Sequence, residues 1–383
     1  MKNKIVSALT LAAVLVAGAS IVSCSSSGGD GDVIKIGVFE PLTGANGAGG
    51  ADEYDGIKLA NKLNPTVLGK KIQLVAVDNK SDKVEAANAA TVLAQKEKVN
   101  AVIGSWGSSL SMSGGPIFAE AKIPAVAVSA TNPNVTKGNE YYFRVCFLDP
   151  FQGTVGAAYA FNVLKAKKVA IIREVSNDYS VGLAKFFVDH FVKLSGDEKS
   201  IVATSDYNTG DQDFSAQLTN IKQFEPDVIF APGNYTESAL IIKQARALGM
   251  TAKFIGGDTW DAATFLEVGG AAVEGATFST FFANDVPINK TSEIFLKAFR
   301  EEFKKEPAAV SALGYDAYMV ILDAITRAKS ADPQKIREAL TQTKNFEGSA
   351  GSITINAERN ADKDAVFKTV KDGKFVFLTT VKP

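Results

Sequence analysis

The sequence predicts an α/β protein with two lobes, each built on a doubly wound, mostly parallel sheet. Short apolar runs suited to buried strands alternate with amphipathic stretches suited to helices. Tight turns rich in Gly, Ser, Asn and Pro join these stretches. The pattern begins again near residue 152, so a second sheet of the same design is expected to follow the first.

Length and composition agree with a large globular protein. The chain has 383 residues, 46% of them hydrophobic and 22% charged, which is ample for more than one domain. The 41 Lys and Arg nearly balance the 42 Asp and Glu, so no nucleic-acid partner is expected. His190 is the only histidine and is expected on a helix, partly buried or at the surface. A histidine-based metal site or Ser-His-Asp triad is therefore not predicted, nor is any cofactor.

Residues 1–23 are predicted to be a lipoprotein signal peptide. Two early lysines precede an apolar run at 5–21, and a cysteine, Cys24, follows shortly. Because a cysteine ends the run, Cys24 is expected to carry lipid. A plain transmembrane anchor is the alternative, since the run is almost long enough to span a bilayer. The Ser- and Gly-rich residues 24–32 are expected to be a flexible tether, and no later segment is expected to span.

The elements of the first lobe follow in order. The predicted strands are 33–39, 72–77, 101–103 and 124–128, and the helices between and after them begin near 52 and cover 82–96 and 111–121. A further strand-like run at 142–147 contains Cys146, which is expected to be a buried free thiol.

The second half continues with strands at 168–172, 201–205 and 227–231, a strand end at 254–260, and helices at 152–165, from 178, at 214–224 and at 236–248. After a run at 276–282 the pattern changes to helices at 292–305, 310–328 and 333–341, and then to strands at 352–355, 366–370 and 375–378. The long apolar helix at 310–328 must be largely buried. The first sheet is the one that still lacks helices to pack on it. The chain is therefore expected to cross between lobes three times, near 148–151, 280–283 and 355–357. The predicted lobes are 33–149 with 281–355, and 150–280 with 356–383.

Two clusters of small polar residues follow neighbouring predicted strands of the first lobe. Residues 104–109 follow the strand at 101–103, and residues 129–133 follow the strand at 124–128. Ligands of open α/β sheets bind outside the carboxyl ends of the strands, so both clusters are expected at one site. Hydroxyls, amides and a helix start favour an anion there, and a carboxylate fits better than a phosphate because no lysine follows the glycines. Ordinary strand-to-helix turns are the alternative.

Four stretches resemble the type I periplasmic binding proteins, and in particular the leucine/isoleucine/valine-binding group of branched-chain amino acid ABC transporters. They are IKIGVFEPLTG at 34–44, AVIGSWGSSLS at 101–111, IPAVAVSATNP at 123–133 and FSAQLTNIK at 214–222. The resemblance extends from Val33 to the C-terminus. It implies the two-lobed type I fold with three hinge crossovers.

The resemblance also implies a set of ligand-binding residues. The carboxylate of an amino acid would be held by Ser108 and by the Ser129-Ala130-Thr131 segment. The ammonium group would be held by Thr131, by the Ser129 carbonyl and, from the other lobe, by Asp258. The family usually has Glu at this acidic position. A helix N-cap is the alternative role for Asp258.

Three aromatic or amide positions complete the predicted site. Tyr179 and either Asn234 or Tyr235 would close over the ligand side chain, and Asn234 stands where the family has an aromatic residue. Trp106 would shape the floor of the pocket or simply pack on the adjacent helix. These departures leave the preferred side chain open.

The expected protein is a monomeric, lipid-anchored capture protein outside the cytoplasm. It would close on an amino acid, a branched-chain one in the first place, and pass it to the permease of an ABC importer. The alternatives are the same fold binding an aromatic acid, urea or short amide, and a ligand-sensing receptor domain. An enzyme is not expected, since no GxSxG, HExxH, CxxC or Walker motif occurs.

Overall fold

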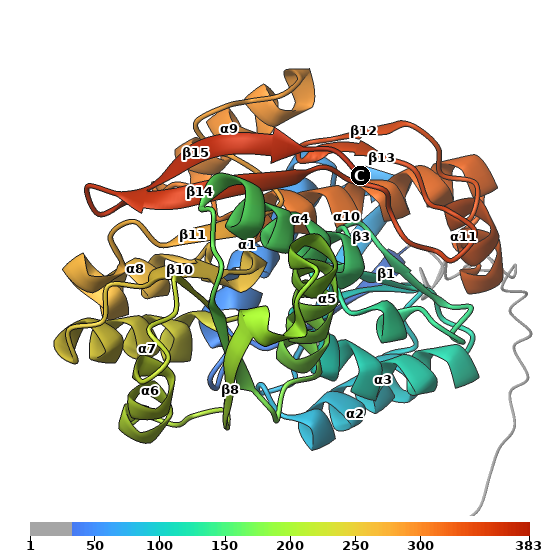
Figure 1. Cartoon of the computed structure of the whole chain (residues 1–383). Helices are drawn as coiled ribbons and strands as arrows, with labels where there is room; N and C mark the ends of the chain where they lie inside the picture. The colour runs from blue at the N-terminus through green and yellow to red at the C-terminus, as the bar shows by residue number, and fades with distance from the viewer. Residues whose placement is uncertain (1–32) are drawn as a thin grey trace, which may run out of the picture. The chain divides into compact units, whose positions relative to one another are not determined.

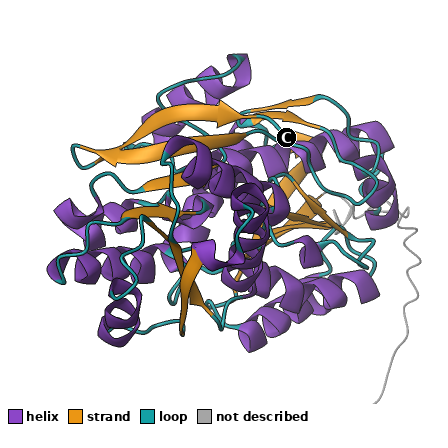
Figure 2. Cartoon of the chain, in the orientation of Figure 1, coloured by secondary structure: helices purple, strands orange, loops and turns teal. Residues whose placement is uncertain are grey.

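The computed structural model describes residues 33–383. The predicted signal peptide, the predicted lipidation site Cys24 and the predicted tether lie outside the described residues. Two sheets, each covered by helices, dominate the described part of the chain (Figure 1, Figure 2).

The first sheet has six strands in the order β2-β3-β1-β4-β5-β6. Its strands are β1 (Val33–Glu40), β2 (Thr66–Val67), β3 (Lys70–Asp78), β4 (Ala101–Gly104), β5 (Ala125–Ala127) and β6 (Tyr142–Arg144). Only the short edge strand β2 runs antiparallel among these six described strands. The carboxyl ends of β1, β4 and β5 therefore lie side by side. This arrangement places the two polar clusters, which follow β4 and β5, at one edge of the sheet, as expected.

The second sheet has seven strands in the order β15-β14-β11-β10-β9-β7-β8. They are β7 (Val169–Glu174), β8 (Ile201–Tyr207), β9 (Val228–Phe230), β10 (Lys253–Gly256), β11 (Thr277–Thr280), β14 (Ala365–Lys371) and β15 (Lys374–Val381). The first five pair in parallel, and β14 and β15 extend the sheet in antiparallel fashion beside β11 (Figure 1). The end of the chain thus returns to the second sheet. The predicted strand at 352–355 instead becomes β13 (Gly351–Ile353), which pairs with β12 (Phe346–Gly348) in a separate ribbon.

The helices connect these strands in the predicted order. They are α1 (Gly47–Leu63), α2 (Lys83–Thr91), α3 (Ser108–Glu120), α4 (Asp149–Ala158), α5 (Asp178–Ser195), α6 (Ser215–Lys222), α7 (Tyr235–Ala247), α8 (Ala263–Gly269), α9 (Lys290–Phe303), α10 (Ala309–Ala328) and α11 (Pro333–Leu340). Two of them are continued by a π-helical turn, Val92–Glu97 after α2 and Tyr159–Val163 after α4. These turns account for the longer helices that the sequence predicts there.

Alternating side chains of β1 show how the first sheet is covered. Ile36 and Val38 belong to the large core that contains residues of α1 and α10, whereas Phe39 packs with residues of α2 and α3. The helices α1 and α10 approach closely, because a Cβ atom on Gly56 would lie only 1.9 Å from the Ser311 carbonyl oxygen. The long apolar helix therefore covers the first sheet, as expected.

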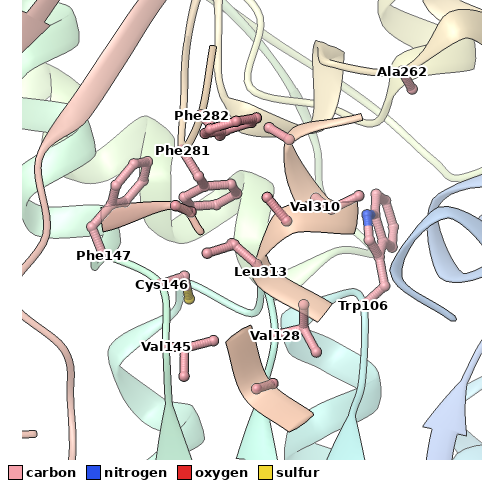
Figure 3. Packing of buried hydrophobic residues seen from close by; sticks show 14 of the residues in the cluster. Trp106, Val128, Val145, Cys146, Phe147, Ala262, Phe281, Phe282, Val310 and Leu313 are labelled. Carbon is pink, nitrogen blue, oxygen red and sulfur yellow. The ribbon is translucent and has the colours of Figure 1, made fainter. Parts of the chain in front are cut away.

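One expectation about α10 needs correction. Among the described residues this helix is long and apolar enough to cross a membrane, although no such segment was expected after the N-terminus. Its surroundings identify it as a core helix, since 78% of its most apolar window is buried. Val310 and Leu313 of α10 belong to the same core as the rings of Phe147 and Phe281, whose centroids are 4.4 Å apart (Figure 3).

Two smaller expectations are confirmed. Cys146 is a free cysteine with no exposed surface, two residues beyond the end of β6. His190 lies on α5 and is partly exposed.

Candidate ligand-binding cleft

A cleft lies between the carboxyl ends of the two sheets. Its cavity volume is about 70 Å³, so the two walls of the cleft lie close together. Six of the nine predicted binding residues line it, and they come from both halves of the chain: Trp106, Ser108, Ser129, Tyr179, Asn234 and Asp258. The other three, Ala130, Thr131 and Tyr235, are buried and do not line it.

The first wall is formed where β4 leads into α3. The helix begins at Ser108, three residues earlier than predicted, after Gly107 at φ +90°. The Ser108 hydroxyl accepts a hydrogen bond from the backbone N–H of Asn132 at 3.1 Å, which ties the two polar clusters together. Because the first N–H groups of a helix have no partner within it, this wall presents donors to a negatively charged group.

A buried arginine holds the second polar cluster from behind. Arg144 has no exposed surface and donates to the carbonyl oxygens of Ala130 at 2.6 Å and Asn132 at 2.9 Å. The Thr131 carbonyl oxygen accepts from the backbone N–H of Asp149 at 3.1 Å. The segment from Ser129 to Asn132 is therefore rigidly placed, and Arg144 adds a positive charge beneath it. Arg144 was not predicted from the sequence.

The opposite wall contains Asp258, which is 5% exposed. Its Oδ1 atom accepts hydrogen bonds from Gln152 Nε2 at 2.7 Å and from the Tyr179 hydroxyl at 3.0 Å, whereas Oδ2 receives neither. Burial raises the pKa of Asp258 to about 7. The alternative role as a helix cap is wrong, because α8 is capped at Ala262 without any side-chain bond. Asp258 thus offers one oxygen to a positively charged group in the cleft.

Asn234 and Tyr235 lie at the start of α7. Asn234 lines the cleft and donates to Asn46 Oδ1 at 3.0 Å. Tyr235 lies behind it, and its hydroxyl donates to the Ala45 carbonyl at 3.2 Å. Its ring meets Trp106 edge-on, with centroids 5.9 Å apart. Of the two candidate positions, only Asn234 therefore lines the described cleft.

Asp178, at the start of α5, forms a clasp across the cleft mouth that was not predicted from the sequence. Its carboxylate accepts from the Ser109 hydroxyl at 2.8 Å and from Lys83 Nζ at 3.0 Å. Its carbonyl oxygen accepts from Asn132 Nδ2 at 2.9 Å. These bonds join the polar clusters of the first sheet to a helix of the second sheet, so the two walls are held together as in a closed state.

Three fully buried acids near the first wall were also missed: Glu40, Glu53 and Asp149. Burial raises the pKa of Asp149 to about 8 and keeps the pKa of Glu40 well above its ordinary value. Burial likewise raises the pKa of Glu53 to about 8. The first wall is therefore not simply a neutral set of hydroxyls, since acids lie directly behind it.

The two walls have opposite chemistry. The first offers amides, hydroxyls and a helix start, with Arg144 beneath, and these suit a carboxylate. The second offers a carboxylate oxygen of Asp258, which suits an ammonium group. A small zwitterion that spans the cleft would pair both of its charges.

Comparisons with known proteins agree with this architecture. Residues 33–374 match the family described as periplasmic binding protein. Leu/Ile/Val-binding protein homolog 1 of Brucella suis is 31% identical, and the match covers 99% of this chain and 100% of the relative.

Two solved structures are similar along nearly their whole length. A leucine binding protein of Thermotoga maritima has 44% sequence identity and a TM-score of 0.88, with 91% of this chain and 99% of that one covered. The branched-chain amino acid transporter substrate binding protein of Streptococcus pneumoniae, solved in complex with isoleucine, has 33% identity and a TM-score of 0.86. That match covers 92% and 100% of the two chains.

Two α/β lobes around a small-molecule cleft define the class of two-lobed solute-binding proteins. More specifically, the chain belongs to the type I periplasmic binding proteins, in their Leu/Ile/Val-binding group. This confirms the family and the fold predicted from the sequence. The family and the solved neighbours are solute-binding proteins rather than enzymes, and the family name implies a place outside the cytoplasm.

Proposed function

We propose that this protein captures a branched-chain amino acid, Leu, Ile or Val, and delivers it to the permease of an ABC importer. The observation that carries the proposal is the pairing across one cleft of the Ser108 helix start with the Asp258 carboxylate. The names of the relatives support the ligand class, because they bind leucine or isoleucine or are called Leu/Ile/Val-binding.

In this proposal the ligand first binds to the wall formed by Ser108 and Ser129, with Thr131 buried behind them. The second lobe then swings closed and brings Asp258 to the ammonium group and Tyr179 and Asn234 to the side chain. Closure is favourable because these contacts exist only in the closed state. Burying the zwitterion requires that each of its charges meets a partner.

Location and domain limits belong to the same proposal. Residues 1–23 would be removed as a signal peptide, and Cys24 would carry the lipid at the end of a tether reaching residue 32. The hinged lobes would be 33–149 with 281–355, and 150–280 with 356–383, and the protein would act as a monomer. Mass spectrometry of the protein from membranes tests the anchor: a lipid-sized mass increase that Cys24→Ala abolishes is expected.

A thermal-shift screen tests the ligand class. The twenty amino acids, benzoate, urea and acetamide are each added to the ligand-free protein. Leu, Ile and Val are expected to raise the unfolding temperature most, because a ligand that binds only the folded state stabilises it. A response to benzoate, urea or acetamide alone would contradict the proposed ligand.

A further inference from the structure

Gln152 bonds directly to the acid of the second wall. It lies in the first turn of α4 and is almost fully buried, and it does not itself line the cleft. Its Nε2 atom donates to Asp258 Oδ1 at 2.7 Å and to the hydroxyl oxygen of Ser279, on β11, at 3.0 Å. The amide thus has one acceptor for each of its two N–H hydrogens, and the shorter bond reaches the acid.

The orientation of this amide leaves its oxygen without a partner. Gln152 Oε1 is buried and receives no hydrogen bond from residues 33–383, which costs free energy. The opposite orientation would set Oε1 against Oδ1 of Asp258, and an ionised carboxylate has no proton to donate to it. The orientation in the structure therefore suits an ionised acid, because hydrogen bonds to a charged group are stronger than those between neutral groups.

The residue before the acid leaves space for two donors on the same oxygen. Tyr179 also donates to Asp258 Oδ1, at 3.0 Å. A Cβ atom on Gly257 would lie 2.1 Å from the Tyr179 hydroxyl oxygen and 3.1 Å from Gln152 Nε2, so a larger residue would displace these donors. Oδ2 of Asp258 receives neither bond. One oxygen is therefore occupied by the protein, and the other remains for a ligand in the cleft.

A second acid, three residues further along, shows what Asp258 lacks. Asp261 is equally buried, and its Oδ2 atom pairs with Lys368 Nζ at 2.8 Å and accepts from the Thr280 hydroxyl at 2.7 Å. Asp258 forms no ion pair with a lysine or arginine among residues 33–383, and its two side-chain donors are neutral. The positive charge that Asp261 receives from the protein is thus left at Asp258 for a ligand to supply.

We propose that Gln152 is a positioning residue for the ammonium group of the ligand: together with Tyr179 it holds Oδ1, keeps Asp258 ionised and leaves Oδ2 for the ligand. This inference rests on the proposed amino acid ligand. A neutral amide suits this role, because a lysine in its place would neutralise the acid and compete with the ammonium group.

Gln152→Met tests the role of the amide, because methionine is also long and unbranched but donates no hydrogen bond. With one donor fewer on Oδ1, the ligand-free protein should keep a proton on Asp258 to higher pH, and leucine must displace that proton. Calorimetry should then show about tenfold weaker leucine binding at pH 6 and at most about threefold weaker binding at pH 8.5. Gln223→Met, at the exposed end of α6, is the matched control and should bind like the wild type at both pH values.

Proton release on binding gives a second reading of the same variant. It is measured by calorimetry in two buffers of different ionisation enthalpy. Burial raises the pKa of Asp258 to about 7, so at pH 8 the wild type should release about 0.1 proton per leucine bound, and Gln152→Met about 0.5. The other titratable groups that act on Asp258 are the same in the wild type and both variants: Glu53, Cys146, Asp149, Tyr179 and Asp261.

Three results would overturn the inference. A loss of equal size at pH 6 and pH 8.5 would show that Gln152 acts only through packing, since a structural role weakens binding evenly. An unchanged affinity at pH 6 or an unchanged proton release at pH 8 would show that the amide does not keep Asp258 ionised.

The wild-type titration distinguishes the two proposals. If the wild type binds none of Leu, Ile and Val, the proposed function fails and this inference fails with it. If the wild type binds but Gln152→Met behaves like Gln223→Met, the inference alone fails.

Circular dichroism checks folding, and if Gln152→Met does not fold, a crystal structure of the wild type with leucine decides. Gln152 Nε2 should still contact one oxygen of Asp258 while the leucine nitrogen contacts the other. A leucine nitrogen that takes the place of Gln152 on its oxygen would overturn the inference.

Discussion

At the scale of single residues, Asp258 is the acidic partner on which the proposed site depends. Its carboxylate is almost fully buried and already has two donors on one oxygen. Asp258→Ala would leave the ligand ammonium without its charged partner, so leucine binding should weaken by about 2–5 kcal/mol. Calorimetry gives the affinity, and Asp189→Ala on the exposed face of α5 is the control. Equal affinities for the wild type and Asp258→Ala would rule out this role.

The same residue predicts a pH dependence of binding. Burial raises the pKa of Asp258 to about 7, and an ammonium ligand requires the ionised form. Below about pH 7 the free protein must therefore release a proton to bind, and affinity should fall by up to about tenfold per pH unit between pH 7 and 5. Asp258→Asn should lose this component of the pH profile, measured by titration at several pH values. A wild-type affinity that rises toward pH 5 would contradict the assignment.

At the scale of elements, the contact between α1 and α10 places the helix that carries Glu53. Alanine normally stabilises a helix relative to glycine, but a Cβ atom on Gly56 would lie 1.9 Å from a carbonyl oxygen of α10. Gly56→Ala is therefore expected to destabilise the protein by about 1–3 kcal/mol in urea unfolding. Gly156→Ala on α4 is the matched control, because its Cβ would meet only ordinary contacts from 3.5 Å outward. Similar small stabilisations in both variants would show that the helices do not pack as described.

The clasp at the start of α5 predicts an effect on ligand release. Asp178 is about half exposed, and its ion pair with Lys83 contributes little in water. Its bonds with Ser109 nevertheless exist only while the walls are together. Asp178→Ala should therefore speed leucine dissociation about three- to tenfold in stopped-flow measurements, because the closed state loses contacts that the open state lacks. An unchanged dissociation rate would mean that the clasp does not hold the cleft shut.

At the scale of the whole molecule, buried acids predict how stability depends on pH. Burial raises the pKa of Glu53, Asp149 and Asp258 to about 8, 8 and 7. Between about pH 4.5 and 8 the folded state therefore binds more protons than the unfolded state, whose carboxyl groups have ordinary pKa values. The free energy of unfolding then decreases as pH rises. The unfolding temperature of the ligand-free protein should fall steadily from pH 5 to pH 8, and a steady rise over that window would contradict the buried, protonated acids.

Much of the fold was predictable because buried parallel strands appear as short apolar runs that end in turn residues. The runs at β4 and β5 and the polar clusters after them are examples. The π-helical turns and the ribbon of β12 and β13 were not predicted, since neither leaves a distinct local pattern. The site was predicted where residues follow strand ends. Glu40, Arg144 and Asp178 were missed because nothing in the local sequence distinguishes a buried charged residue, or one that bonds across the cleft, from an ordinary charged residue at the surface.

The central claim is that one small zwitterion spans the cleft, with its carboxylate at the first wall and its ammonium group at Asp258. A crystal structure of the protein with leucine tests this most directly. The leucine nitrogen is expected within hydrogen-bonding distance of Asp258, and the leucine carboxylate at Ser108 and the start of α3. Leucine bound in the opposite direction, or outside the cleft, would contradict it.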